Sequence, residues 1–169
     1  MSLQDEQSMG ESLLGGGLYG RFDYTLDAKK RFSIPADWRE AMGSPVYVYV
    51  MPDPGKQCLH LLPPEEMKRN FDMLRHRELF DEDLDEVMGI IGENVDQVRL
   101  DVQGRIRVSD QLLAYAMIED TVVMVGTQTR AQLWSLKLRP AVATVDKTAF
   151  SEACDAYKVC KSRMLSRKR

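Results

Sequence analysis

The chain has 169 residues, of which 44% are hydrophobic, which suits one globular domain or two small halves fused into one. No apolar run approaches the length of about 18 residues that indicates a membrane span, and no secretory signal is visible at the N-terminus. The three cysteines, Cys58, Cys154 and Cys160, are an odd number without dense spacing, which indicates free thiols in a reducing cytoplasm rather than a disulfide framework.

The net charge of −3 hides an uneven distribution. Residues 158–169 contain six basic residues and no acid, which leaves 17 of the 23 basic residues to balance all 26 acids. A basic arm on an acidic body is typical of a nucleic-acid-binding tail, although a solvated chain end explains it equally well. The acidity of the body confines any DNA contact to a local surface.

The first half begins with residues 1–17, which are small and polar, lack an apolar period and are therefore expected to be disordered. Period-two alternation and β-branched or aromatic runs predict strands over residues 18–25, 32–34, 46–51 and 57–62. Helices are expected after Pro35, Pro63 and Asp81. The apolar stripes of the last two helices, expected to be buried, are Met67, Phe71 and Leu74, and then Leu84, Val87, Met88 and Ile91.

The second half repeats this plan, which places a first repeat at residues 18–92, a second at 93–157 and a basic tail at 158–169. Its expected strands are residues 95–100, 105–108, 121–125 and 131–134. A short helix is expected over residues 111–115. Further helical stretches are expected from Leu136 onward, with a break near Pro140, and over residues 148–164.

One ten-residue stretch recurs in the two halves. Residues 26–35 read Leu-Asp-Ala-Lys-Lys-Arg-Phe-Ser-Ile-Pro, and residues 100–109, 74 positions later, read Leu-Asp-Val-Gln-Gly-Arg-Ile-Arg-Val-Ser. Each copy has Asp-x-x-x-Arg before an alternation of apolar and polar residues. The recurrence indicates an internal duplication.

The chemistry of the repeated loop follows from its residue types. Asp27 and Asp101 can accept hydrogen bonds from the backbone N–H groups that follow them. Gly104 suits a left-handed backbone, whereas Lys30 at the matching position predicts either strain on the order of 1 kcal/mol or a different turn. The first tip gathers Lys29, Lys30 and Arg31, and on the second tip Arg105 and Arg107 share a strand face.

Two interpretations of these loops remain open. Each Arg could merely pair with the Asp of its own turn, since weak surface ion pairs are common. Alternatively, paired cationic loops on a two-fold scaffold could straddle a DNA groove, with Arg donating to guanine and Lys or Arg neutralising phosphates.

The two loops also carry a family resemblance. Residues 26–35 together with Asp101–Arg105 closely resemble the paired Asp-x-x-x-Arg motifs of the MraZ family, and Val122–Gly126 and Leu133–Ser135 resemble that family's second half. The similarity covers residues 19–138. Two positions depart from the family pattern, since Lys30 replaces the usual Gly and Ser109 the usual Pro.

The resemblance implies an α+β fold, a duplicated AbrB-like swapped-hairpin β-barrel with helices after each half, assembled into ring-shaped homo-oligomers. It also implies a cytoplasmic, nucleoid-associated bacterial transcriptional regulator. Such a regulator binds repeated operator half-sites on double-stranded DNA upstream of the division and cell-wall gene cluster. The DNA-binding residues would be Lys29, Lys30, Arg31, Arg105 and Arg107, and the loop-organising residues Asp27, Asp101 and Gly104.

Other functions find less support in the sequence. His60 is expected to point outward from a strand, and neither it nor His76 has a Cys or His partner at ligand spacing, so no metal and no cofactor are expected. No nucleophile-elbow, phosphate-loop or dinucleotide motif is present, so an enzyme is not expected. The alternatives to specific DNA binding are a ring-forming protein scaffold that uses the acidic helices, and nonspecific DNA binding by the basic tail.

Overall fold

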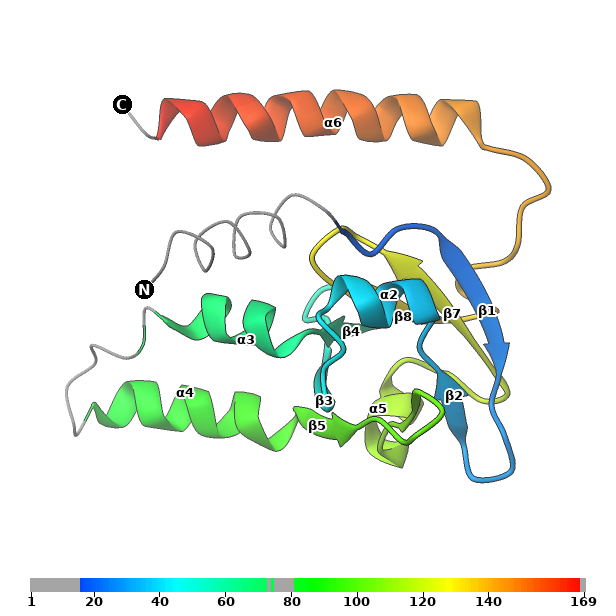
Figure 1. Cartoon of the computed structure of the whole chain (residues 1–169). Helices are drawn as coiled ribbons and strands as arrows, with labels where there is room; N and C mark the ends of the chain where they lie inside the picture. The colour runs from blue at the N-terminus through cyan, green and yellow to red at the C-terminus, as the bar shows by residue number, and fades with distance from the viewer. Residues whose placement is uncertain (1–15, 73, 75–80, 168–169) are drawn as a thin grey trace, which may run out of the picture. The chain divides into compact units, whose positions relative to one another are not determined.

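The computed structural model describes residues 16–72, 74 and 81–167. It forms two compact units, Met1–Arg139 and Pro140–Arg169, and each is described by itself. The elements of the first unit (Figure 1) are β1 (Arg21–Thr25), β2 (Arg31–Ser33), α2 (Ala36–Ala41), β3 (Tyr47–Pro52), β4 (Leu59–Leu62), α3 (Pro64–Phe71), α4 (Glu82–Glu93), β5 (Asp96–Arg99), β6 (Arg105–Arg107), α5 (Asp110–Tyr115), β7 (Thr121–Gly126) and β8 (Ala131–Ser135).

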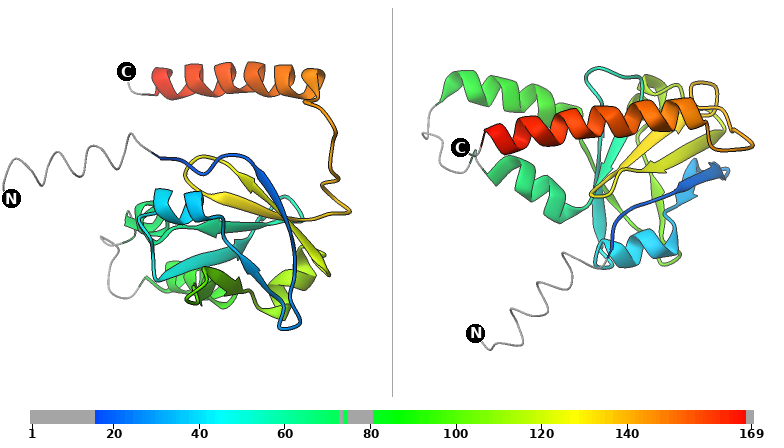
Figure 2. Two further views of the ribbon diagram at one scale, coloured as in Figure 1. Left: turned by 45° about the vertical axis from the view of Figure 1, so that its right-hand side comes forward. Right: turned by 90° about the horizontal axis from the view of Figure 1, so that it is seen from above.

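The strands of the two halves interleave. Six strands form an antiparallel sheet in the order β1-β7-β8-β4-β3-β5, so three of its five pairings join a strand of one half to a strand of the other. The remaining strands, β2 and β6, pair antiparallel with each other as a separate two-stranded ribbon (Figures 1 and 2). The α+β class is therefore confirmed.

The closed barrel expected from the resemblance is not found among the described strands. β1 and β5 are the two ends of the six-stranded sheet, and no pairing joins them. The ribbon strands do not close this gap, because β2 and β6 pair only with each other among the described strands.

The ribbon is anchored by the apolar core. Phe32 and Ile106 face each other at its centre and are both buried, and Ile34 and Val108 extend the same buried row. Trp38, the first large side chain of α2, packs edge-on against Phe22, with ring centroids 5.2 Å apart. The core draws on both halves of the chain, so the loops that flank the ribbon rest on a fixed base.

The helices α3 and α4 begin where expected, and Asp81 caps α4 by accepting a hydrogen bond from the N–H of Leu84 at 3.0 Å. The expectation that their apolar stripes are buried is wrong, because neither helix has a buried residue. Val87 of α4 is 52% exposed, and Ile90 is exposed beside it. Leu84, Met88 and Ile91 are half-buried, so the described part of the first unit covers the apolar face of α4 only in part.

The second unit contains one helix, α6 (Lys147–Ser166), capped by Asp146, which accepts from the N–H of Ala149 at 3.0 Å. It confirms the helix expected over 148–164 and continues past residue 158, where the sequence suggested a separate tail. The helix expected from Leu136 is absent. A hydrogen-bonded turn on Ser135 and then Pro140, which has no N–H, end the regular structure there.

Some expectations fall on residues that are not described, namely the N-terminal segment up to residue 15 and His76. Across the described residues, no helix has both the length and the apolar character to span a membrane.

Candidate nucleic-acid interface

The first repeated loop is closed by its own aspartate. One carboxylate oxygen of Asp27, Oδ1, accepts hydrogen bonds from the backbone N–H groups of Lys29 at 2.9 Å and Arg31 at 2.8 Å. The other oxygen, Oδ2, accepts from Nε of Arg31 at 2.8 Å. Backbone bonds between Asp27 and Arg31 and from Lys30 to Asp27 complete a tight turn.

The second loop repeats this geometry bond for bond. Oδ1 of Asp101 accepts from the N–H groups of Gln103 and Arg105, both at 2.9 Å, and Oδ2 accepts from Nε of Arg105 at 2.7 Å. The duplication in the sequence is therefore a duplication of hydrogen-bonded structure. Of the two interpretations left open above, the pairing of each Arg within its own turn is what the structure contains.

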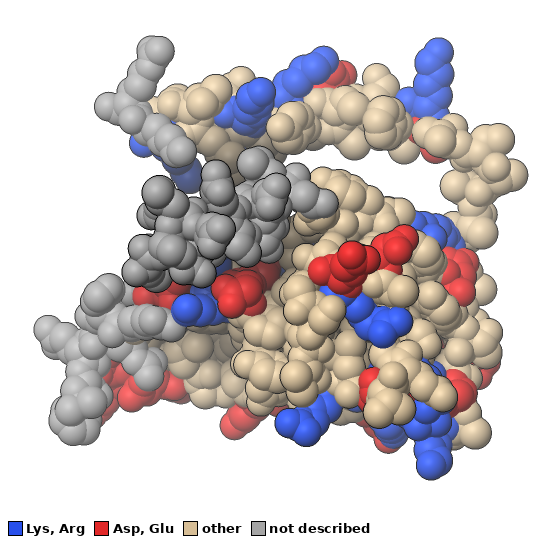
Figure 3. Space-filling view, viewed as in Figure 1, with Lys and Arg blue, Asp and Glu red and all other residues tan. Residues whose placement is uncertain are grey.

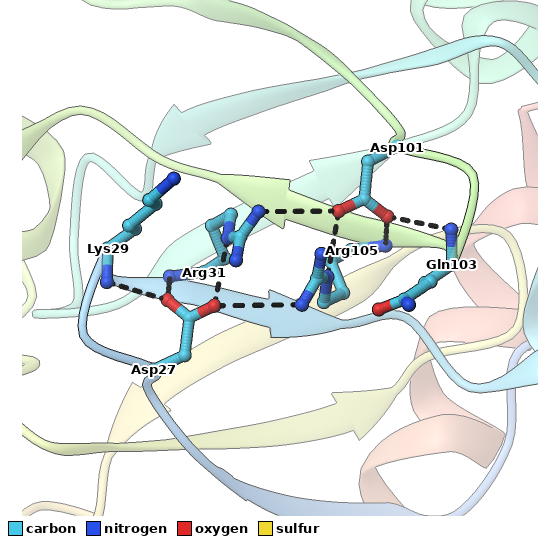
Figure 4. A network of polar contacts seen from close by, with 6 residues as sticks. All are labelled: Asp27, Lys29, Arg31, Asp101, Gln103 and Arg105. Atoms are coloured by element: carbon cyan, nitrogen blue, oxygen red, sulfur yellow. Dashed lines mark hydrogen bonds and ion pairs between the residues drawn. The ribbon is translucent and has the colours of Figure 1, made fainter.

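The two loops also contact each other across the ribbon. Arg31 Nη1 lies 3.8 Å from Oδ2 of Asp101, and Arg105 Nη1 lies 3.8 Å from Oδ2 of Asp27 (Figure 4). The antiparallel register, in which Arg31 is opposite Arg107 and Ser33 opposite Arg105, makes this exchange reciprocal. Two carboxylates and two guanidinium groups thus form one network that links both loops.

The network stabilises the charged form of both aspartates. Backbone N–H donation, from Arg31 to Asp27 and from Arg105 to Asp101, is the largest cause that holds the pKa of each carboxyl below its ordinary value, and the paired guanidinium adds to it. The two arginines therefore have permanent anionic partners at neutral pH.

The guanidinium groups and the loop lysine are partly or fully exposed. The side chains of Arg31 and Arg105 are 29% and 28% exposed, and no hydrogen bond within the described chain engages their Nη groups. Lys29 is exposed and, among the described residues, its amine has no ion-pair partner. Figure 3 shows Lys and Arg side chains, mixed with carboxylates, at the end of the molecule where the β1–β2 loop lies in Figure 1.

Asp110, at the start of α5, is a further member of this surface that sequence reasoning missed. It binds Nζ of Lys30 at 3.0 Å and Nη2 of Arg107 at 3.2 Å, and these contacts lower its pKa. Its partner Lys30 lies 80 residues away in the sequence, so no local pattern could have revealed the pair. Arg107 lies one residue beyond the buried Ile106, on the same side of β6 as Arg105, as expected.

Lys30 adopts the same left-handed backbone conformation as Gly104, the matching residue of the second loop. Its φ is 58°, and that of Gly104 is 75°. The alternative of a differently built first turn is therefore excluded, and the first loop carries the strain that a side chain incurs in this region, on the order of 1 kcal/mol.

Comparison with known proteins gives the same family as the sequence motifs. Residues 93–138 match the family described as "MraZ protein, putative antitoxin-like". This segment contains the second loop. A protein of Alkaliphilus metalliredigens named "Transcriptional regulator MraZ" is 28% identical over 116 residues, which cover 69% of this chain and 79% of that protein.

Other relatives match over a longer stretch. Proteins with the same name from Thermoanaerobacter sp. and Clostridium acetobutylicum are 28% and 27% identical, over 82% and 79% of this chain and 94% and 93% of their own lengths. The resemblance to the MraZ family is confirmed.

The strain at Lys30 predicts opposite effects for two substitutions. Lys30→Gly relieves the left-handed strain and loses only an exposed ion pair, so the free energy of unfolding is expected to stay constant or rise by up to about 1 kcal/mol. Gly104→Ala is expected to lower it by about 1–2 kcal/mol, because a Cβ is strained at this positive φ and also requires the flexible Arg39 side chain, 2.5 Å away, to shift. Urea unfolding of both variants measures the free energy of unfolding. Equal losses in the two variants would contradict the strain assigned to Lys30.

The lowered pKa values predict a loss of stability in acid. A carboxyl with a lower pKa in the folded state stabilises the fold above its unfolded pKa of about 3.9, and this contribution disappears as pH falls through the folded pKa. The double variant Asp27→Asn, Asp101→Asn is therefore expected to lose less stability than the parent when denaturant unfolding is compared between about pH 5 and pH 2. Asp83→Asn, on α4, is the control and should retain the parent slope.

Proposed function

We propose that this protein is a DNA-binding transcriptional regulator that contacts double-stranded DNA through the two loops of the β2–β6 ribbon. The observation that carries the proposal is the reciprocal network that holds both loops in one matched geometry and leaves cations and free N–H donors outside it. The relatives named as transcriptional regulators support the same class. Such a protein acts as a binding module rather than as an enzyme.

The geometry divides the proposed DNA-binding residues into two groups. Arg31 and Arg105 use only part of their hydrogen-bonding capacity within the protein. Nε of each donates to a carboxylate, whereas the Nη groups remain able to donate to a phosphate or a guanine. Lys29, Lys30 and Arg107 supply the net positive charge, because the four-membered network is neutral by itself. Asp27, Asp101 and Gly104 keep their proposed role of shaping the loops.

Such a small surface needs repetition to bind tightly. One ribbon presents five cations, partly offset by three aspartates, so a single chain is expected to bind DNA weakly. A homo-oligomer, ring-shaped by resemblance to the family, would present many ribbons to repeated half-sites and gain by avidity. Interleaved halves of the kind seen here suit a swapped-hairpin protomer, and the proposed setting is the nucleoid of a bacterial cytoplasm.

The decisive variant removes outer cations and leaves the network intact. Lys29→Ala with Arg107→Ala is expected to weaken binding to DNA from upstream of the division and cell-wall cluster and to reduce the salt slope by about 2 per bound chain. Thermal unfolding should stay near that of the parent, because neither residue is buried. Fluorescence anisotropy over a range of salt concentrations measures both quantities.

The matched control is Lys68→Ala on α3, which lies on the opposite side of the unit from the ribbon in Figures 1 and 2 and should bind like the parent. A second variant, Arg31→Ala with Arg105→Ala, opens the network itself. If this variant binds the same DNA as tightly as the parent, the loops are not the DNA-contacting surface.

A protein-interaction scaffold is the second candidate, and the surface of α4 favours it. This helix has five acids and no base, and Val87 and Ile90 are exposed among them. Such a face suits a partner with apolar and basic side chains. Protein that shows no DNA preference at any salt concentration, yet loses a protein partner after Val87→Ser with Ile90→Ser, would favour the scaffold over the regulator.

Nonspecific binding by the basic tail predicts a different outcome. Deletion of Pro140–Arg169 removes a whole compact unit and none of the ribbon residues. We expect sequence preference to remain and the affinity for unrelated DNA to fall, because the deleted segment carries the concentrated positive charge. Loss of preference for the specific site in an electrophoretic shift assay would instead assign recognition to the tail.

A further inference from the structure

A second cluster of reactive side chains lies at the tip of the β3–β4 hairpin. Pro52 is opposite Leu59 at the end of the paired strands, and the N–H of Asp53 donates to the carbonyl of Cys58 at 2.9 Å, which extends the register by one pair. Side chains at alternate positions of a strand share a face. Asp53, Cys58 and, two residues on, His60 therefore point to the same side of the hairpin.

The three side chains converge closely. One ligand atom from each, namely a carboxylate oxygen, the thiol sulfur and a ring nitrogen, all lie within 4.8 Å of one another. Asp53 Oδ2 and His60 Nε2 are 2.7 Å apart. The Asp53 and His60 side chains are only 15% and 14% exposed, and Cys58 is fully buried. The His60 side chain thus lies on the opposite face of β4 from Leu59 and Leu61, as expected, but it is largely buried rather than directed into solvent.

The pair formed by Asp53 and His60 leaves the ring incompletely satisfied. The second ring nitrogen, Nδ1, is buried and has no hydrogen-bond partner among the described residues. If Nε2–H donates to the carboxylate, Nδ1 holds a buried lone pair, and if both nitrogens are protonated, Nδ1–H is buried instead. Either state leaves a buried polar atom without a partner among the described residues, which is unfavourable.

We propose that Asp53, Cys58 and His60 bind a divalent transition metal ion, with Zn²⁺ as the preferred cation. Thiolate, imidazole and carboxylate are the ligands that zinc takes in proteins, and a set that contains a thiolate disfavours Mg²⁺ and Ca²⁺. Three protein ligands leave a fourth position for water. On binding, the thiol proton of Cys58 passes to solvent and the thiolate becomes a ligand.

The surroundings preorganise these ligands. Oδ1 of Asp53 accepts from the N–H groups of Gly55 at 2.8 Å and Lys56 at 2.9 Å, which orients the carboxylate and leaves Oδ2 toward His60. Tyr115 of α5 donates its hydroxyl to the backbone carbonyl of Asp53 and fixes the hairpin tip from outside. Burial, together with the nearby Asp53 charge, raises the pKa of the Cys58 thiol to about 11, so without a cation this sulfur is neutral.

The test uses untagged full-length protein that carries Cys154→Ser and Cys160→Ser, because these two exposed thiols of α6 could bind metal by themselves. Titration with Co²⁺ is expected to give a saturable thiolate-to-cobalt charge-transfer band with one ion per chain, displaced by Zn²⁺. His60→Gln in this background is expected to weaken Zn²⁺ at least about tenfold in a chelator competition. Zn²⁺ should raise the melting temperature of the parent background but not of the variant.

Cys58→Ser should abolish the charge-transfer band. Because Cys58 is buried, circular dichroism in the presence of chelator establishes whether the Cys58→Ser variant is folded. The His60→Gln variant, at a partly exposed position, tests the proposal independently of Cys58. Absence of the band in the parent background, or equal Zn²⁺ affinity before and after His60→Gln, would overturn the proposal and leave a hydrogen-bonded Asp–His pair. The metal measurements contain no DNA, so their result is independent of the proposed regulator function.

Discussion

The ribbon depends on one interaction, the acceptance of two backbone N–H groups by a single aspartate oxygen. Asp27 and Asp101 each close a turn in this way, and the second oxygen of each is then left in position for an arginine. Because a carboxylate fixed by backbone donors cannot rotate away, the arginine it holds is also fixed. The antiparallel register then brings the two Asp–Arg pairs within 3.8 Å of each other. The same two carboxylates therefore determine both the shape of the loops and the ion-pair network.

This arrangement requires both halves of the chain. The ribbon has one strand from each, and the residues at its centre, Phe32 and Ile106, are buried in a core to which both halves contribute. A single repeat would place its loop at the end of an unpaired three-residue strand, which cannot hold a fixed geometry. Duplication thus supplies the partner strand, the partner carboxylate and the shared core at once.

The sequence predicted what depends on local chemistry. The Asp-x-x-x-Arg turns, the β-branched strands and the Asp81 cap follow from residue types a few positions apart. Contacts set by strand register were not predictable, whether between distant segments, as for Asp110 with Lys30, or across one hairpin, as for Asp53 with His60. The closed barrel came from family resemblance rather than from residues. The prediction that the apolar stripes of α3 and α4 are buried was wrong for a related reason. Periodicity shows which face of a helix is apolar but not whether other residues cover it.

The two loops have the same backbone and different chemistry, and this difference bears on how they would meet DNA. The first places Lys29 and the strained Lys30 beside Arg31, whereas the second has Gln103 and Gly104 beside Arg105. Lys30 therefore adds a positive charge to the first loop at a conformational cost that Gly104 does not have in the second. Lys30 is also tied to Asp110, which holds Arg107 of the other repeat, so the extra charge is shared across the ribbon. On the proposed role the ribbon is therefore a pseudo-symmetric contact, in which the first loop contributes more to phosphate binding and the second has a neutral amide at the matching position.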